Sequence, residues 1–94
     1  MTRRVRLTER AEDDLRRLET FLVDKNPDAA LRAVDAIAQA ILSLGEYADR
    51  GFPGPIAKLK QIPVPFGDSG YVIQYRVQGD SVIVARVKHA RERR

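Results

Sequence analysis

The sequence contains no cysteine, no tryptophan and only one histidine among its 94 residues. Without cysteine there is no disulfide framework and no thiolate metal site, and His89 alone cannot supply a zinc site. Long apolar runs are also missing. No stretch approaches the roughly 20 residues that a membrane helix needs, and the start, MTRRVRL, lacks the apolar run of a signal peptide. These absences favour a cytoplasmic protein without membrane contact, and they indicate neither a metal nor a cofactor.

Length and composition predict one domain, residues 1–94. A chain of this size buries only about 60–65% of its unfolded surface, so its core is modest. Hydrophobic residues make up 44% and charged residues 32% of the chain, which is an ordinary balance for a soluble domain. The chain shows no internal repeat, linker or low-complexity segment.

The net charge of +4 is concentrated at the two ends of the chain. Residues 86–94 hold five basic side chains and one acidic side chain, residues 1–6 hold three arginines, and the stretch between them is therefore 4 − 4 − 3 = −3. If the two ends meet in the fold, they form one positive patch. Such a patch attracts nucleic acid or an acidic protein segment. A solvated basic tail is the alternative interpretation.

Two amphipathic helices are predicted in the first half of the chain. Thr8 is a suitable N-cap for a helix over residues 9–24, whose first turn is acidic. Asn26 and Pro27 end this helix and begin another over residues 27–44, because Pro27 restricts the residue before it and suits the first helical position. Helices joined by so few residues must fold back as an antiparallel hairpin.

Alternation of polar and apolar residues predicts four strands. They cover residues 4–7, 58–66, 71–77 and 81–88, and residues 45–57 are predicted to be a loop. Pro63 and Pro65 cannot donate to a ladder, so the second strand should lie at an edge or lose its pairing early. The predicted fold is α+β, in the order β-α-α-β-β-β, with the helical hairpin packed on a small antiparallel sheet.

The last two strands have predicted faces. Alternation places Tyr71, Ile73, Tyr75 and Val77 on one face of the third strand, and places Ile83, Ala85 and Val87 together on the fourth strand, opposite Val82, Val84 and Arg86.

Several polar residues have a structural interpretation. Ser69 follows Gly67 as in a nucleophile elbow, but Tyr71 stands where the second glycine belongs and a strand follows, so Ser69 is a turn residue. Tyr71 and Tyr75 are interpreted as core aromatics with hydroxyls at the rim. Asp13 and Asp14 are interpreted as helix-terminus charges, not as a catalytic carboxylate pair.

A basic set near the C-terminus is the candidate site. It consists of Arg76, Arg86, Lys88, His89 and Arg91. In a ribonuclease, the cations would stabilise charge at the scissile phosphate and the histidine would transfer protons. Without that chemistry, the same surface would dock a partner. Composition does not decide between these two uses.

The whole chain resembles the ParE/RelE superfamily of toxins from bacterial type II toxin–antitoxin modules. The resemblance rests on the order and spacing of several short stretches: Val5-Arg6-Leu7, Ala11…Asp14-Leu15, Asn26-Pro27-Asp28-Ala29-Ala30, Gly70-Tyr71-Val72-Ile73…Tyr75-Arg76-Val77 and Val87-Lys88-His89…Arg91. It implies a helical hairpin on a small antiparallel sheet and a cognate antitoxin as partner.

The resemblance is closer to the ParE branch, whose members inhibit DNA gyrase, than to the RelE branch of ribosome-dependent mRNA endonucleases. Pro63, Pro65 and Val72 stand where the nuclease branch has basic residues. Arg91 matches a late arginine of that branch, but no tyrosine follows it, and Ala90 stands where a related subgroup has a tyrosine after its histidine.

A gyrase-inhibiting toxin is therefore expected, with no catalytic residue and with a target-binding set of Arg76, Arg86, Lys88, His89 and Arg91. The alternative is an mRNA endonuclease in which Arg76, Arg86, His89 and Arg91 are catalytic. A module whose toxicity has been lost is a third interpretation, and direct binding to nucleic acid is left open.

Overall fold

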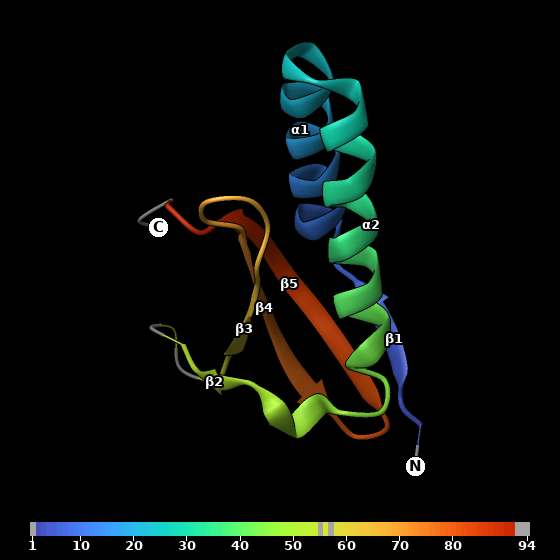
Figure 1. Cartoon of the computed structure of the whole chain (residues 1–94). Coiled ribbons are helices and arrows are strands. Elements are labelled where there is room, and N and C mark those ends of the chain that lie inside the picture. Colours follow the sequence, from blue (N-terminus) through green and yellow to red (C-terminus); the bar gives the residue numbers. More distant parts are fainter. Residues whose placement is uncertain (1, 55, 57, 92–94) are drawn as a thin grey trace.

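Two helices pack on a five-stranded sheet in the computed structural model, which describes residues 2–54, 56 and 58–91 (Figure 1). The elements in chain order are β1 (Arg4–Leu7), α1 (Glu9–Lys25), α2 (Pro27–Ser43), a 3₁₀ turn (Ala48–Arg50), β2 (Phe52–Pro53), β3 (Lys60–Val64), β4 (Tyr71–Gln78) and β5 (Ser81–His89). The predicted α+β class and the predicted order of the longer elements are confirmed.

The helices begin and end where the local sequence predicts. The Thr8 hydroxyl accepts a hydrogen bond from the N–H of Ala11 at 3.1 Å, and the Asn26 side chain accepts one from the N–H of Ala29 at 3.2 Å. The N–H of Asn26 donates to the carbonyl of Leu22, so Asn26 both ends α1 and begins α2. Among the described residues, no helix is long and apolar enough to cross a membrane.

The strands lie in the order β1-β5-β4-β3-β2. β3, β4 and β5 form the predicted antiparallel meander, whereas β1 lies parallel to β5 with Leu7 opposite Val84. The prediction of a plain loop over residues 45–57 is wrong, because this stretch contains the 3₁₀ turn and β2. β2 pairs only with Lys60 and Gln61, so the outer ladder of β3 ends before Pro63, as a strand containing proline requires.

The core lies between the helices and one face of the sheet, and both predicted core tyrosines belong to it. Tyr71 is 4% exposed and Tyr75 is fully buried. The Tyr75 hydroxyl donates to the carbonyl of Ala48 at 2.5 Å and accepts from the N–H of Gly51 at 3.0 Å. Tyr75 therefore holds the 3₁₀ turn against the sheet.

A β-bulge overturns the predicted faces of β5. Gln74 lies opposite Arg86, but the next residue, Tyr75, lies opposite Val84, so Ala85 is an extra residue on β5. An extra residue moves the side chains beyond it to the other face. Val87 therefore joins Val84 in the core, and it is not on the face of Ala85.

The described basic residues from the two ends of the chain lie at different positions along β5. Arg4 pairs with Ser81 at the beginning of β5, whereas His89 ends that strand and Arg91 follows it. Eight residues of extended chain separate Ser81 from His89, which corresponds to about 26 Å. Arg4 is therefore remote from His89 and Arg91, whereas Arg6 lies opposite Ile83, three residues before Arg86.

Candidate functional site

The histidine lies at the end of β5, in a defined set of contacts. His89 is paired with Tyr71 on β4, and the two rings meet edge to face with their centroids 5.5 Å apart. Nδ1 of His89 accepts a hydrogen bond from the N–H of Arg91 at 3.1 Å, and Nε2 lies 3.3 Å from the Ser69 hydroxyl. Because Nδ1 is an acceptor, the hydrogen of the neutral ring is assigned to Nε2, which donates to Ser69. Ser69 lies in the predicted turn.

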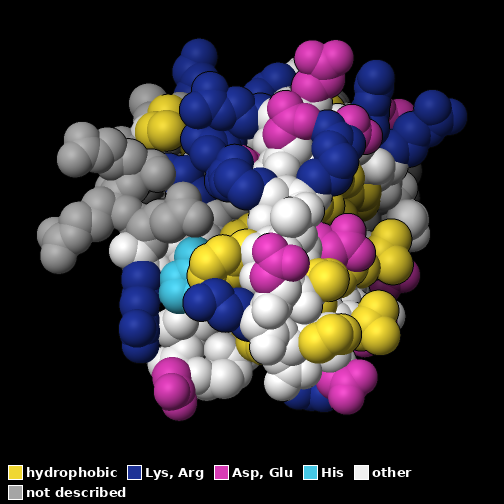
Figure 2. All heavy atoms as spheres, turned by 90° about the horizontal axis from the view of Figure 1, so that it is seen from above, with side chains coloured by type: hydrophobic (Ala, Val, Ile, Leu, Met, Phe, Trp, Pro, Cys, Tyr) yellow, Lys and Arg dark blue, Asp and Glu magenta, His cyan; other side chains and the backbone are white. Residues whose placement is uncertain are grey.

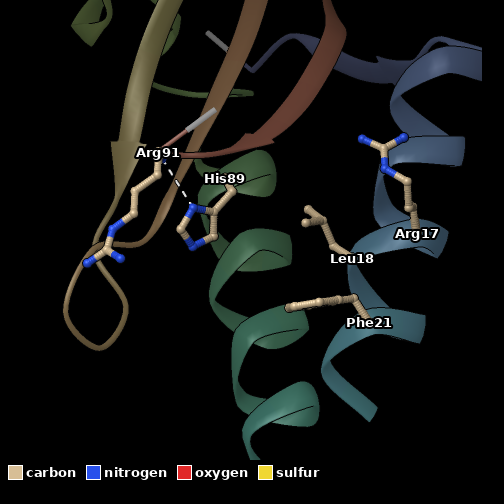
Figure 3. A pocket seen from close by; sticks show the side chains of 5 residues that line it. All are labelled: Arg17, Leu18, Phe21, His89 and Arg91. Carbon is tan, nitrogen blue, oxygen red and sulfur yellow. Dashed lines mark hydrogen bonds between the residues drawn. The ribbon is translucent and has the colours of Figure 1, made fainter. Parts of the chain in front are cut away.

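A pocket of about 490 Å³ lies between this end of β5 and helix α1. In Figure 3, Leu18 and Phe21 of α1 project across the pocket toward His89, while Arg17 and Arg91 lie on its opposite sides. Leu18 is 8% exposed and Phe21 is 60% exposed, so the α1 wall begins in the core and ends at the surface. None of the described side chains that line this pocket is acidic. We call it the α1–β5 pocket.

The surface around the pocket combines basic and apolar side chains. Figure 2 shows Lys and Arg side chains gathered toward one side of this face and hydrophobic side chains toward the other, with both kinds next to the histidine. Lys25 contributes to this surface, because its Nζ lies 5.2 Å from the centre of the Phe21 ring. That distance is within the range of a cation–π contact.

A buried carboxylate holds β5 against α1. Asp14 is 1% exposed and accepts hydrogen bonds from Nε of Arg86 at 2.8 Å and from the N–H of Val87 at 2.9 Å. Arg86 donates a second bond to Asp14 at 3.2 Å, and Arg17 donates one at 3.1 Å. The interpretation of Asp14 as a simple helix-terminus charge is wrong, because its partners lie at the other end of the chain.

The electrostatics of Asp14 favour its charged form. Desolvation by burial alone would raise the pKa of this carboxyl group. The hydrogen bonds from Arg86 and Val87, together with the positive charges of Arg86 and Arg17, outweigh that effect and hold the pKa below its ordinary value of 3.8. The Asp14–Arg86 ion pair is therefore intact at neutral pH.

The structure separates the five residues of the predicted site. His89 and Arg91 share the α1–β5 pocket, whereas Arg86 forms an ion pair with the buried Asp14. Lys88 is 8% exposed and follows the alternation of β5 onto the other face of the sheet.

Arg76 lies on β4, two residues beyond the Gln74–Arg86 pair and on the same face of the sheet as Arg86. It lies opposite Ile83 and donates to Gln78. Tyr71, the partner of His89, is five residues away along β4, which corresponds to about 17 Å. Arg76 is therefore remote from the pocket.

The sheet face that carries Lys88 brings together two positions singled out in the sequence. Pro63, Val72 and Lys88 are direct neighbours across β3, β4 and β5, and the row beside them consists of Gln61, Gln74 and Arg86. The side-chain oxygen of Gln74 is buried without a hydrogen-bond partner among the described residues. Lys88 is thus the only basic residue in the row that contains Pro63 and Val72.

The residues of the α1 wall were missed by sequence reasoning. No functional role was predicted for Leu18, Phe21 or Arg17. One signal was available: Phe21 follows Leu18 by three residues and precedes Lys25 by four, which places all three along one side of a helix. The depth of the pocket between α1 and β5 depends on long-range packing and has no local signature.

Residues 5–94 match the family model described as the ParE toxin of the type II toxin–antitoxin system parDE. This chain belongs to the ParE toxin family. The sequence-based resemblance to the ParE/RelE superfamily is confirmed, and the family identifies the chain as the toxin of a type II toxin–antitoxin module.

Two toxins that carry the RelE name are similar to this ParE-family chain over nearly its whole length. Toxin RelE1 of Caulobacter vibrioides is 42% identical over 95 residues, with 100% of each chain covered. Toxin RelE3 of the same organism is 40% identical over 90 residues, which cover 96% of this chain and 97% of that toxin.

Solved structures share the fold. The chromosomal ParDE toxin–antitoxin system from P. aeruginosa superposes with a TM-score of 0.81 at 21% identity, covering 95% of this chain and 97% of that one. The RelBE2 toxin–antitoxin complex from Mycobacterium tuberculosis superposes with a TM-score of 0.68 at 21% identity, covering 98% and 95%. At these identities, the likeness is one of fold.

Proposed function

We propose that this ParE-family toxin acts by binding its target, that the target is DNA gyrase, and that His89 and Arg91 contribute to the contact. The main support is the composition of the sheet face on which the resemblance places the nuclease residues of the RelE branch. Pro63 and Val72 occupy two of those positions, and neither can stabilise a phosphate or transfer a proton. The ParE family match points in the same direction.

The contacts of His89 also favour binding over proton transfer. Nδ1 already accepts the N–H of Arg91, and Nε2 is within hydrogen-bond distance of Ser69. A general acid or base needs a ring nitrogen within reach of the substrate proton. His89 instead forms one wall of a mainly apolar pocket.

The test measures both activities with one protein preparation. Purified toxin is added to gyrase and relaxed plasmid, and separately to an extract that contains ribosomes and mRNA. We expect loss of supercoiling at toxin concentrations that leave the mRNA intact. Intact supercoiling together with cut mRNA would overturn the proposal. In cells that express the toxin, we expect plasmid relaxation and the DNA-damage response to precede the loss of full-length mRNA.

The second candidate function is ribosome-dependent mRNA cleavage, which the names of the two Caulobacter relatives favour. It would assign catalysis to Arg76, Arg86, His89 and Arg91. The wide separation of Arg76 from His89 and the use of Arg86 by Asp14 weigh against this assignment. Cleavage in the extract would establish it all the same.

We further propose that a cognate antitoxin binds and neutralises this chain. The two solved relatives are described as a ParDE toxin–antitoxin system and a RelBE2 toxin–antitoxin complex. Leu31 and Leu42 on α2 are 70% and 66% exposed, and Leu42 lines an apolar hollow of about 270 Å³ together with Leu7 and Leu15. An apolar surface of this kind is typical of a protein interface.

The small open reading frame adjoining the toxin gene should encode this antitoxin, with a disordered, partly acidic C-terminal segment. Co-expression should yield a stable complex that buries more than about 1,000 Å². Absence of any adjoining small reading frame, or failure of its product to bind, would count against the proposal.

A further inference from the structure

The α1–β5 pocket lies where the hydrophobic core reaches the surface of the protein. Leu18 still packs in the core, but Phe21, one turn further along α1, is 60% exposed. The facing wall is formed by the His89 ring, which is held from behind by an edge-to-face contact with Tyr71, with 5.5 Å between the ring centroids. A partner that inserts an apolar side chain between these two walls would complete the packing, because a void deprives its lining of contacts.

The opening of the pocket is positively charged. Arg17 comes from α1 and Arg91 from beyond β5, and both line the pocket. Figure 3 shows Arg17 on the α1 side and Arg91 beyond the His89 ring, with its guanidinium group directed away from α1. Arg17 donates a hydrogen bond to Asp14 at 3.1 Å, and a guanidinium group has five N–H donors. Asp14 itself is satisfied by Arg86 and Val87. Arg17 can therefore donate to the carboxylate of a partner while it keeps its hydrogen bond to Asp14.

We propose that the α1–β5 pocket binds an aromatic or aliphatic anchor side chain, flanked by carboxylates, on a short acidic segment of the antitoxin. This inference rests on the proposed function, in which an antitoxin binds the toxin. The apolar walls take the anchor, and Arg17 and Arg91 pair with the carboxylates. Because His89 and Arg91 also belong to the proposed target surface, the bound segment excludes the target from it.

The fit of the pocket to this chemistry supports the assignment. Its volume of about 490 Å³ is within the 300–1,000 Å³ typical of a ligand site. The walls of the pocket belong to a helix and a strand, so their positions are fixed before a partner binds. A disordered segment that folds on binding must recover its ordering entropy from a few well-buried anchors. Charge complementarity selects an acidic segment, since the described lining includes cations and no acid.

A small probe tests the pocket without any antitoxin. The chain has a single histidine, so the ring resonances of His89 report on the pocket without ambiguity. We expect 3-phenylpropionate to shift them saturably at fixed pH. Propionate, which lacks the ring, and 3-phenylpropanamide, which lacks the charge, should shift them several-fold less. An equal response to propionate would mean a plain anion site, and no response would mean no site. Either result overturns the proposal.

Variants locate the binding. Phe21→Ala should abolish the response to 3-phenylpropionate, and Arg91→Gln should weaken it. Phe52→Ala is the matched control, because Phe52 is 62% exposed on β2, away from the pocket. An unchanged response in Phe21→Ala would overturn the assignment. Thermal unfolding of each variant verifies that it is folded.

The antitoxin is then titrated against the same proteins. Truncating an anchor contact typically weakens binding about 30-fold or more, and we expect this for Phe21→Ala. Arg91→Gln should weaken binding several-fold, with Phe52→Ala unchanged. Binding that is equal for all variants would overturn the docking assignment and leave the proposed function intact. Failure of the unsubstituted toxin to bind would overturn both, whereas the supercoiling assay tests gyrase inhibition independently of either.

Discussion

The Asp14 carboxylate accepts a hydrogen bond from the backbone N–H of Val87 at 2.9 Å, beyond the point where β1 ends. Thr8 continues the edge first, since its N–H donates to the carbonyl of Val84 and its hydroxyl donates to that of Ala85. Asp14 satisfies the next backbone donor. Residues of the α1 segment thus bond to the backbone of β5 where β1 has ended. These bonds hold α1 beside β5 and so fix the distance between the two walls of the pocket.

Removing the Asp14 side chain should destabilise the fold strongly. Asp14→Ala leaves the Val87 N–H and the partly buried Arg86 guanidinium without their acceptor, and breaking a buried pair in this way costs about 3–5 kcal/mol. Urea denaturation measures the loss. Asp13→Ala is the matched control, because Asp13 is an exposed neighbour whose pairing with Arg16 contributes less than about 1 kcal/mol. Similar effects at both positions would contradict the proposed role of Asp14.

The contribution of Asp14 should depend on pH in one direction. Its pKa in the folded protein lies below the ordinary value of 3.8, so folding favours the charged form. The resulting stability is fully present above the pKa that Asp14 has in the unfolded chain. It is lost as the pH falls through the lower pKa that Asp14 has in the folded protein. The difference in unfolding free energy between the unsubstituted protein and Asp14→Asn should therefore be constant from pH 7 to about 5 and should shrink below about 4. A difference independent of pH would show that the carboxylate is not held ionised.

Gly51 and Tyr75 should behave as a coupled pair. A Cβ atom at Gly51 would lie 2.3 Å from the Tyr75 hydroxyl, so Gly51→Ala forces the ring to move. Tyr75→Phe leaves the carbonyl of Ala48 and the N–H of Gly51 without a buried partner, at a cost of about 1–3 kcal/mol. In the double variant the closest clash, with the hydroxyl, is gone, and only the ring carbons at 2.9 and 3.0 Å still have to move. Its loss of stability should be smaller than the sum of the two single losses, and strict additivity would contradict this contact.

The features that sequence reasoning predicted well are local ones. Thr8 and Asn26 bond to residues three positions away, so the caps and bounds of both helices can be read from short windows. The pairing of β3 with β4 and of β4 with β5 also follows from tight turns. Tyr71, Ile73 and Tyr75 recur at every second position of β4, which places them on one face, and the burial of the tyrosines was predicted from that spacing.

The features that were missed depend on distant parts of the chain. Asp14 and Arg86 are 72 positions apart, and no local sequence pattern around either residue predicts that they form an ion pair. The bulge at Ala85 moves Val87 into the core through a single extra residue, which a regular alternation cannot reveal. The predicted site failed for the same reason, since the register of β5 decides which of its basic residues face the pocket, the other side of the sheet or helix α1.

Replacing the histidine should distinguish the two proposed activities. If the toxin acts by binding, His89→Ala should keep toxicity within a few-fold of the unsubstituted level, because most interface residues contribute little individually. Loss of a general acid or base would lower the cleavage rate by about 10²–10⁴-fold. Growth arrest after induction measures toxicity, with Ser69→Ala as a control for the hydrogen bond to Nε2. A loss of the larger size, together with mRNA cleavage in the extract, would favour the endonuclease.

Two arginines near the end of the chain should separate folding from binding. Arg86→Gln removes both charge-assisted bonds to Asp14, so we expect a loss of about 1.5–3 kcal/mol in unfolding free energy. Arg91 is exposed, and Arg91→Glu should change stability by less than about 0.5 kcal/mol.

The binding of the same two variants should show the opposite order. Arg91→Glu should weaken binding to gyrase, because it reverses a charge on the proposed target surface, and the difference from the unsubstituted toxin should shrink at high salt, where exposed charges are screened. Arg86→Gln, measured at a temperature where it is folded, should bind nearly as well as the unsubstituted toxin. If Arg91→Glu is folded and fully toxic, the target surface does not include this end of β5, and the basic residues there are a solvated terminus.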